Sequence, residues 1–178
     1  MDASSISMYL KETWATIYMT LISSSISYLI GIPLGVILVV TDKDGIHPMT
    51  PVHAVLGMLI NIFRSIPFLI LLVMVLPLTK MLVGTTLGPK AIIPPLIIAS
   101  APYIGRMVES SLKEVNAGVI EAAKSMGATN GQIIFKVLLP EAKPSLLVGA
   151  AICITTILSY SAMAGFVGGG GLGAIALN

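Results

Sequence analysis

Charged residues and cysteine are both scarce in this sequence. Only 10% of its 178 residues are charged, whereas 56% are hydrophobic, and a soluble domain carries about 25% charged residues. A soluble fold of this length could not bury so much apolar surface. The net charge of +2 comes from basic residues that are spread singly, which gives no nucleic-acid-binding patch. The single cysteine, Cys153, lies within an apolar run and excludes a disulfide framework.

The sequence also lacks the residue patterns of several enzyme classes. It has no G-x4-G-K-[ST] phosphate-binding loop, so we expect no ATPase site in this chain. No H-E-x-x-H pattern is present and no pair of acids lies within an apolar run, so an intramembrane enzyme has nothing from which to build a site. His47 and His53 lie near Asp42 and Asp44, where we expect a solvated loop rather than a metal site. We predict no catalytic residue, metal or cofactor in the chain itself.

What the sequence does contain is four apolar runs long enough to cross a bilayer, which takes about 20 residues each. They cover residues 14–40, 55–78, 91–108 and 146–167. Prolines predict a kink near Pro33 in the first run and an irregular start in the third. The sequence therefore predicts an all-α polytopic transmembrane helical bundle with four spanning helices, in one domain over residues 1–178. The first residues lack a basic stretch followed by an apolar one, so no cleaved signal peptide is expected.

The distribution of basic residues predicts the orientation, because cytoplasmic loops are richer in Lys and Arg. One side of four alternating spans holds seven of the ten basic residues, namely Lys43, Arg64, Arg106, Lys113, Lys124, Lys136 and Lys143. The other side holds Lys11, Lys80 and Lys90. The first side is therefore predicted to be cytoplasmic, with the N-terminus outside.

A polar segment over residues 109–145 separates the last two runs. Two alanines favour a short helix over 119–125, and Gly127 would close this helix as a C-terminal cap. A second helix is predicted over 130–139, beginning at a threonine or asparagine cap and ending at Pro140. Two interpretations remain open: an interfacial helix pair packed on lipid, or a compact knob that a partner protein contacts.

The spacing of seven residues in this segment resembles the EAA motif of bacterial ABC importer permeases, E-A-A-x3-G-x9-I-x-L-P. The matching residues are Glu121, Ala122, Ala123, Gly127, Val137, Leu139 and Pro140. Only Val137 departs from the motif, in place of isoleucine. In that family the motif forms the coupling helix, which docks into a cleft of a separate cytoplasmic ATP-binding subunit. The resemblance implies that these residues couple the chain to an ATPase from a cytoplasmic region of about 109–145.

Other stretches resemble one branch of that superfamily, the methionine importer permeases. They lie at 61–89, 101–115 and 159–173, and the sequences FRSIPF and YSAMAG are the more specific pieces. Arg64 in FRSIPF also has a simpler explanation as an interfacial charge before a kink. Small residues beside the glycine run indicate close helix approach near a translocation pathway. We expect this pathway to be lined by Pro67, Phe68, Ser159, Tyr160, Ser161, Ala162, Met163 and Gly165.

The resemblance implies a transport subunit rather than an enzyme. Such a chain acts as a homodimer in the lipid of the bacterial inner membrane, with ATP and Mg bound by its cytoplasmic partner. An extracytoplasmic, lipid-anchored binding protein would deliver the substrate. The resemblance also implies five spanning helices, whereas the sequence supplies four, so a fifth is expected but missing. Two alternatives stay open: a permease for another amino acid, and an ATP-independent channel or membrane scaffold.

Overall fold

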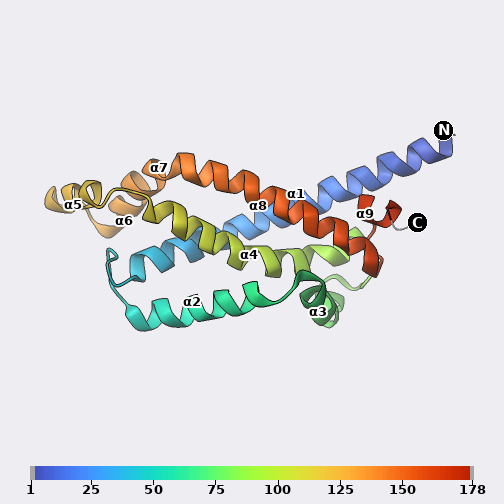
Figure 1. Cartoon of the computed structure of the whole chain (residues 1–178), viewed down its shortest axis with the longest axis horizontal. Coiled ribbons are helices and arrows are strands. Elements are labelled where there is room, and N and C mark those ends of the chain that lie inside the picture. The colour runs from blue at the N-terminus through green and yellow to red at the C-terminus, as the bar shows by residue number, and fades with distance from the viewer. Residues whose placement is uncertain (1–2, 177–178) are drawn as a thin grey trace.

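The computed structural model describes residues 3–176, and this part of the chain contains helices and no strand. Figure 1 shows their arrangement. The elements in chain order are α1 (Ala3–Thr41), α2 (Thr50–Ser65), α3 (Phe68–Val83), α4 (Pro89–Lys113), α5 (Ala117–Ser125), α6 (Asn130–Ile133), the π-helix η1 (Ile134–Leu138), α7 (Leu139–Glu141), α8 (Lys143–Met163), the 3-10 helix η2 (Ala164–Val167) and α9 (Leu172–Ile175). The predicted all-α bundle is confirmed.

The predicted second span is not one straight helix. Three helices in the described residues are long and apolar enough to cross a membrane, namely α1, α4 and α8 with its continuation to Val167. α2 and α3 bend by 105° at a short break, so the chain has a fourth span only if this pair counts as one. The break falls at Ile66, which is extended with ψ 122°, directly before Pro67. A proline disfavours the helical conformation in the residue before it, which explains the break.

Prolines elsewhere are absorbed without a break. α1 continues as one helix of 39 residues through Pro33. α4 starts regularly at Pro89 and continues through its inner prolines, so the predicted irregular start of this run is wrong. A proline in the first helical turn lacks only an N–H that would have had no helical partner. Neighbouring helices also help proline-containing helices to persist in membranes.

Small residues hold α1 close to α4, which lies at the centre of the bundle. A Cβ atom on Gly35 would lie only 2.5 Å from Cβ of Val108, so the two backbones approach as closely as glycine allows. Eight residues earlier in both helices, the hydroxyl oxygens of Ser27 and Ser100 lie 2.7 Å apart and share a hydrogen bond. Small residues and buried hydroxyl pairs are typical of helix contacts inside membranes.

The bundle has two distinct ends (Figure 1). α5, α6 and the connection from α1 to α2 lie at one end, and α9 lies at the other, beside the N-terminal half of α1. The sides between them carry exposed apolar residues, such as Leu59, Ile70 and Val148 on α2, α3 and α8. A surface of this kind suits lipid or another membrane chain.

Candidate functional site

Residues 114–142, which we call the knob, form α5, α6, η1 and α7 at the end of the bundle away from α9 (Figure 1). Only residues 114–116 separate α4 from α5. α5 can begin so soon because Asn116 caps it: the Asn116 side-chain oxygen accepts a hydrogen bond of 2.8 Å from the N–H of Gly118. The knob is therefore joined directly to the last turn of α4.

Gly127 closes α5 as predicted, because its backbone adopts a left-handed conformation with φ +80°. Its N–H donates to the carbonyl of Lys124 at 2.9 Å, and the N–H of Ala128 donates to the carbonyl of Ala123 at 3.1 Å. No neighbouring atom lies within 4 Å of the position that a Cβ on Gly127 would take. The glycine is needed here for its backbone angle and not for lack of room.

The second half of the knob begins at Thr129, which confirms one of the two predicted caps. The N–H of Thr129 donates to Gln132 Oε1 at 2.9 Å, and Thr129 Oγ1 accepts from the N–H of Gln132, which together form a capping box. This arrangement satisfies N–H groups that the helix start would otherwise leave unpaired.

The predicted end of the helical run at Pro140 is wrong. The helix passes through Pro140, because residues 134–138 adopt a π-helix in which the N–H of Leu139 donates to the carbonyl of Ile134. Proline cannot donate to the carbonyl four residues earlier, and its ring crowds that carbonyl. A wider turn just before the proline accommodates both effects. As a result, η1 continues without a break into α7, and α8 begins directly after Ala142.

The seven residues of the EAA motif divide into two groups. Four of them are exposed: Glu121, Ala122, Gly127 and Pro140. Ala123 is only 5% exposed and belongs to the hydrophobic core together with Leu138, while Val137 and Leu139 are half-buried against it. The motif therefore supplies both the outer surface of the knob and the contacts that hold its helices together.

The exposed surface of the knob also carries apolar side chains that are not among the predicted site residues. Met126 is 82% exposed and Phe135 is 72% exposed. Large exposed apolar side chains of this kind are frequent where a partner protein binds, and methionine and aromatic residues are enriched at interfaces. The one sequence signal for the exposure of Met126 is its position at the end of α5, directly before Gly127.

At the base of the knob lies a group of four charged side chains, which we call the ion cluster: Asp42, Arg106, Glu109 and Lys113. Lys113 Nζ lies 2.6 Å from a carboxylate oxygen of Asp42 and 2.8 Å from one of Glu109. Arg106 Nη1 lies 2.6 Å from the other oxygen of Glu109. The ammonium group of Lys113 holds the pKa of Asp42 below its ordinary value. The Glu109 side chain is 6% exposed, and such a buried charge needs both of its cations.

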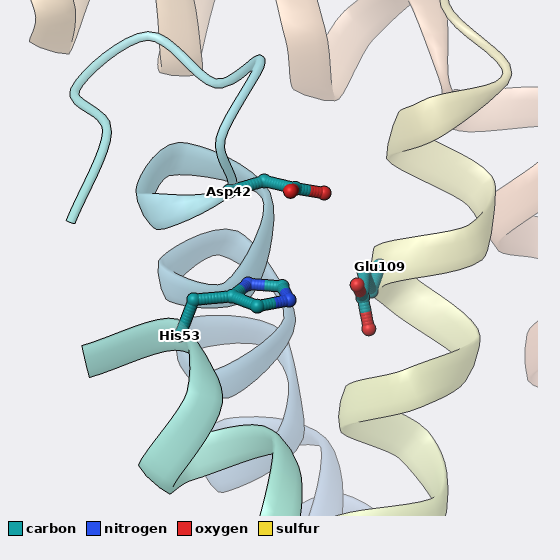
Figure 2. Close-up of side chains that lie close together, drawn as sticks. All are labelled: Asp42, His53 and Glu109. Carbon is teal, nitrogen blue, oxygen red and sulfur yellow. The ribbon is translucent and has the colours of Figure 1, made fainter. Parts of the chain in front are cut away.

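Asp42 and Glu109 also lie close to His53, and Figure 2 shows these three side chains turned toward one another from α2, α4 and the end of α1. One potential ligand atom of each lies within 4.8 Å of the others, a spacing that a metal ion could use. However, Lys113 already bridges both carboxylates, and Nδ1 of His53 is 2.9 Å from the carbonyl oxygen of Leu38. The positive charge between these two carboxylates is therefore supplied by the ammonium group of Lys113.

The two segments expected to line a pathway meet in space. Phe68, at the start of α3, stacks on Tyr160 of α8, with ring centroids 4.6 Å apart and an interplanar angle of 5°. Pro67 lies directly before α3, at the break from α2, and is exposed. Because Phe68 is 7% exposed, it contributes mainly to this stack and less to any open surface.

The remaining pathway candidates lie on different faces of the end of α8. Ser159, Ala162 and Met163 are exposed. Ser161 is 1% exposed, and its hydroxyl donates to the carbonyl of Leu158 at 2.7 Å. Gly165 is half-buried, and a Cβ on it would lie 2.5 Å from the carbonyl carbon of Gly173. Only the first three therefore offer a side chain to the outside of this chain.

Residues 168–173, which we call the glycine loop, are packed rather than extended into solvent. A Cβ on Gly169 would lie 2.5 Å from Ile92, and one on Gly173 would overlap the carbonyl oxygen of Ala162. α1 ties the loop down, because Glu12 accepts from the N–H of Gly171 at 2.6 Å and Thr16 accepts from that of Leu172 at 2.9 Å. The run of four glycines is therefore a close-packed turn and not a flexible linker.

Comparison with known proteins agrees with this arrangement. Residues 31–178 match the family described as binding-protein-dependent transport system inner membrane component. A permease from Vibrio cholerae, named for D-methionine transport, is 51% identical over 170 residues, which are 96% of this chain and 76% of that protein. The D-methionine transport system permease protein MetI of Escherichia coli K12 is 47% identical over 158 residues, or 89% of this chain and 73% of MetI.

Solved structures give the same result. A structure of the MetNI methionine ABC transporter in an inward-facing conformation matches with a TM-score of 0.97 and 45% identity, over 99% of this chain and 82% of that one. An amino acid ABC transporter solved with histidines matches with a TM-score of 0.76 at 22% identity, which shows a shared fold. The fold, the motif and the matched residues together show that the chain belongs to the family of binding-protein-dependent transport system inner membrane components.

Proposed function

We propose that this chain is the membrane-spanning subunit of an ATP-binding cassette importer for methionine. The observation that carries the proposal is the knob: a capped helix with exposed motif residues Glu121, Ala122 and Gly127, attached directly to the spanning helices α4 and, through α7, α8. The names of relatives 47% to 51% identical over most of this chain support methionine as the substrate.

The knob is the docking surface for a separate ATP-binding subunit. Met126 and Ala122 provide apolar area on its exposed face, and Glu121 adds a charge for a polar contact. The partner binds and hydrolyses ATP with Mg, since the sequence of this chain has no phosphate-binding loop. Movement of the partner reaches the bundle through the short connections of the knob to α4 and α8 and shifts the equilibrium between inward-open and outward-open states.

Two copies of the chain form the transporter in the bacterial inner membrane. Three or four spans are too few to enclose a pathway, and α2, α3 and α8 carry apolar side chains on their exposed faces. The knob is cytoplasmic because Lys113, Lys124 and Lys136 lie on or beside it. In contrast, Lys11 lies near the start of α1, Lys80 near the end of α3 and Lys90 at the start of α4. An extracytoplasmic binding lipoprotein delivers the substrate at the other end of the bundle.

The pathway runs along the end of α8 and the break between α2 and α3. Ser159, Ala162 and Met163 are its lining residues, because their side chains are exposed at this level of the bundle. Pro67 joins them at the break. Phe68, Tyr160, Ser161 and Gly165 act behind this lining and fix its shape, through the stacked rings and the packing against Gly173.

A transport assay with the full-length chain tests the proposal. The chain is purified with its ATP-binding subunit, placed in lipid vesicles and supplied with the binding protein, and the uptake of labelled D-methionine and L-methionine is measured. We expect uptake that requires ATP. Uptake without ATP would identify a channel instead, and ATP-dependent uptake of another amino acid in place of methionine would refute the substrate.

A further inference from the structure

We propose that the ion cluster is a joint that makes α2 and the C-terminal ends of α1 and α4 move together when the knob moves. Its four side chains come from α4 and from the residue that follows α1. The inference rests on the proposed function, since it concerns how motion from the ATP-binding subunit spreads into the bundle. It names residues outside the EAA motif as positioning residues for transport.

The first link of the joint connects α4 to α1. Lys113 is the last residue of α4, and its ammonium group bridges Glu109 on the same helix and Asp42 just after α1. The side chain of Lys113 is 43% exposed, that of Asp42 is 22% exposed and that of Glu109 is 6% exposed. This gradient places Glu109 at the buried centre, where loss of a counter-ion has a large effect.

The second link connects α4 to α2. Arg106 Nη1 binds Glu109, while its Nη2 donates to the carbonyl of Gly57 at 3.1 Å and to Asn61 Oδ1 at 3.2 Å. Gly57 leaves room for this contact, since a Cβ there would lie 3.0 Å from Arg106 Nη2. A single buried carboxylate thus holds two cations, one of which reaches α1 and the other α2.

A cavity between knob and bundle gives such a joint a larger share of the contact between them. A cavity of about 360 Å³ lies between the loop after α1 and α5, with Gly45, Ile46, Ala117 and Ile120 among its lining residues. Packing between α5 and this loop is therefore interrupted at the cavity. Lys113 and Asp42 line the cavity, and their ion pair links the end of α4 to the residue after α1 beside it.

The test measures methionine taken up per ATP hydrolysed by the complete transporter in vesicles. Lys113→Met keeps the length of the side chain and removes its charge. We expect this variant to lower the ratio by about fivefold or more, a typical range for coupling between sites, while the ATP-binding subunit stays bound. The matched control is Lys43→Met, because Lys43 pairs with Asp44 at 3.8 Å in the same loop with both side chains about 80% exposed. The control should leave the ratio unchanged.

A second variant keeps the test decisive if Lys113→Met fails to fold. Asp42→Asn preserves the shape of the partner and should also lower the ratio, and the double variant should be no worse than Lys113→Met alone, because the two residues act as a pair. If the Asp42–Lys113 pair only stabilised the fold, the variants would lower the amount of complex. Methionine uptake and ATP hydrolysis would then fall in proportion, and their ratio would not change. An unchanged ratio in Asp42→Asn, with a wild type that transports methionine, would overturn the joint and leave the proposed function standing. A wild type that does not transport would refute both.

Discussion

Gly127 at one end of this bundle and Gly169 and Gly173 at the other are required for different reasons. At the knob, Gly127 has open space around it and is required by its left-handed backbone angle. At the other end, Gly169 and Gly173 are enclosed, and a methyl group on either would overlap Ile92 or the backbone of Ala162. The difference shows that one end presents a surface while the other is closed by packing. Ion pairs tie down the first end, and close packing together with hydrogen bonds from the loop backbone to Glu12 and Thr16 ties down the second.

The largest expected effect comes from filling the closed end. Gly173→Ala places a methyl group on the carbonyl of Ala162, where the backbone has no room to relax. We expect a loss of about 3 kcal/mol in the free energy of unfolding, at the upper end for overpacked sites. Unfolding in detergent can be followed by the fluorescence of the single tryptophan, Trp14. Gly131→Ala is the matched control, because nothing lies within 4 Å of a Cβ there, and equal stability of both variants would mean that the glycine loop is not packed as described.

An intermediate effect separates backbone strain from function. Gly127 and Gly84 have φ of +80° and +81°, and both have open surroundings. Alanine at either position should therefore destabilise the chain by a similar amount, about 1–2 kcal/mol. Only Gly127→Ala should also reduce methionine uptake per ATP, because Gly84 follows α3 and lies outside the knob. Equal uptake by the two variants would remove Gly127 from the docking surface.

The smallest effect concerns the charges at the knob end. Lys113 lowers the pKa of Asp42 in the folded chain. The contribution of ionised Asp42 to the free energy of unfolding is therefore complete above the ordinary aspartate pKa of about 3.9. It disappears as the pH falls through the lower pKa that Asp42 has in the folded chain. The unfolding midpoint of wild type should exceed that of Asp42→Asn at pH 7, and the gap should narrow as the pH is lowered below 4. A gap that is constant with pH would show that the ion pair contributes nothing.

The features that the sequence could predict are local ones. Gly127 as a helix cap and Thr129 as a helix start depend on a few neighbouring residues, and the structure confirms both. The motif spacing also identified the segment that forms the knob. In contrast, the effects of proline were predicted poorly, because Pro67 breaks a predicted span while Pro140 is absorbed by a π-helix. Which of these occurs depends on the backbone geometry around each proline.

The long-range features were out of reach of the sequence. The ion cluster joins Asp42 to Lys113, residues that periodicity assigns to separate loops, and only the packing of α1 along α4 brings them together. The same holds for the stack of Phe68 on Tyr160 and for the bonds from Glu12 and Thr16 to the glycine loop. Burial was also out of reach. Ser161 was expected to line an open pathway, but its side chain is buried within this chain.

The most direct test of the docking surface measures the affinity of the full-length chain in detergent for its ATP-binding subunit, comparing Met126→Ala with Met81→Ala. These methionines are 82% and 84% exposed, but Met126 lies on the knob and Met81 lies near the end of α3. We predict that Met126→Ala weakens binding at least about tenfold, as truncation of a central interface residue does, and that Met81→Ala leaves it unchanged. Equal binding by both variants and wild type would contradict the assignment of the knob as the docking surface.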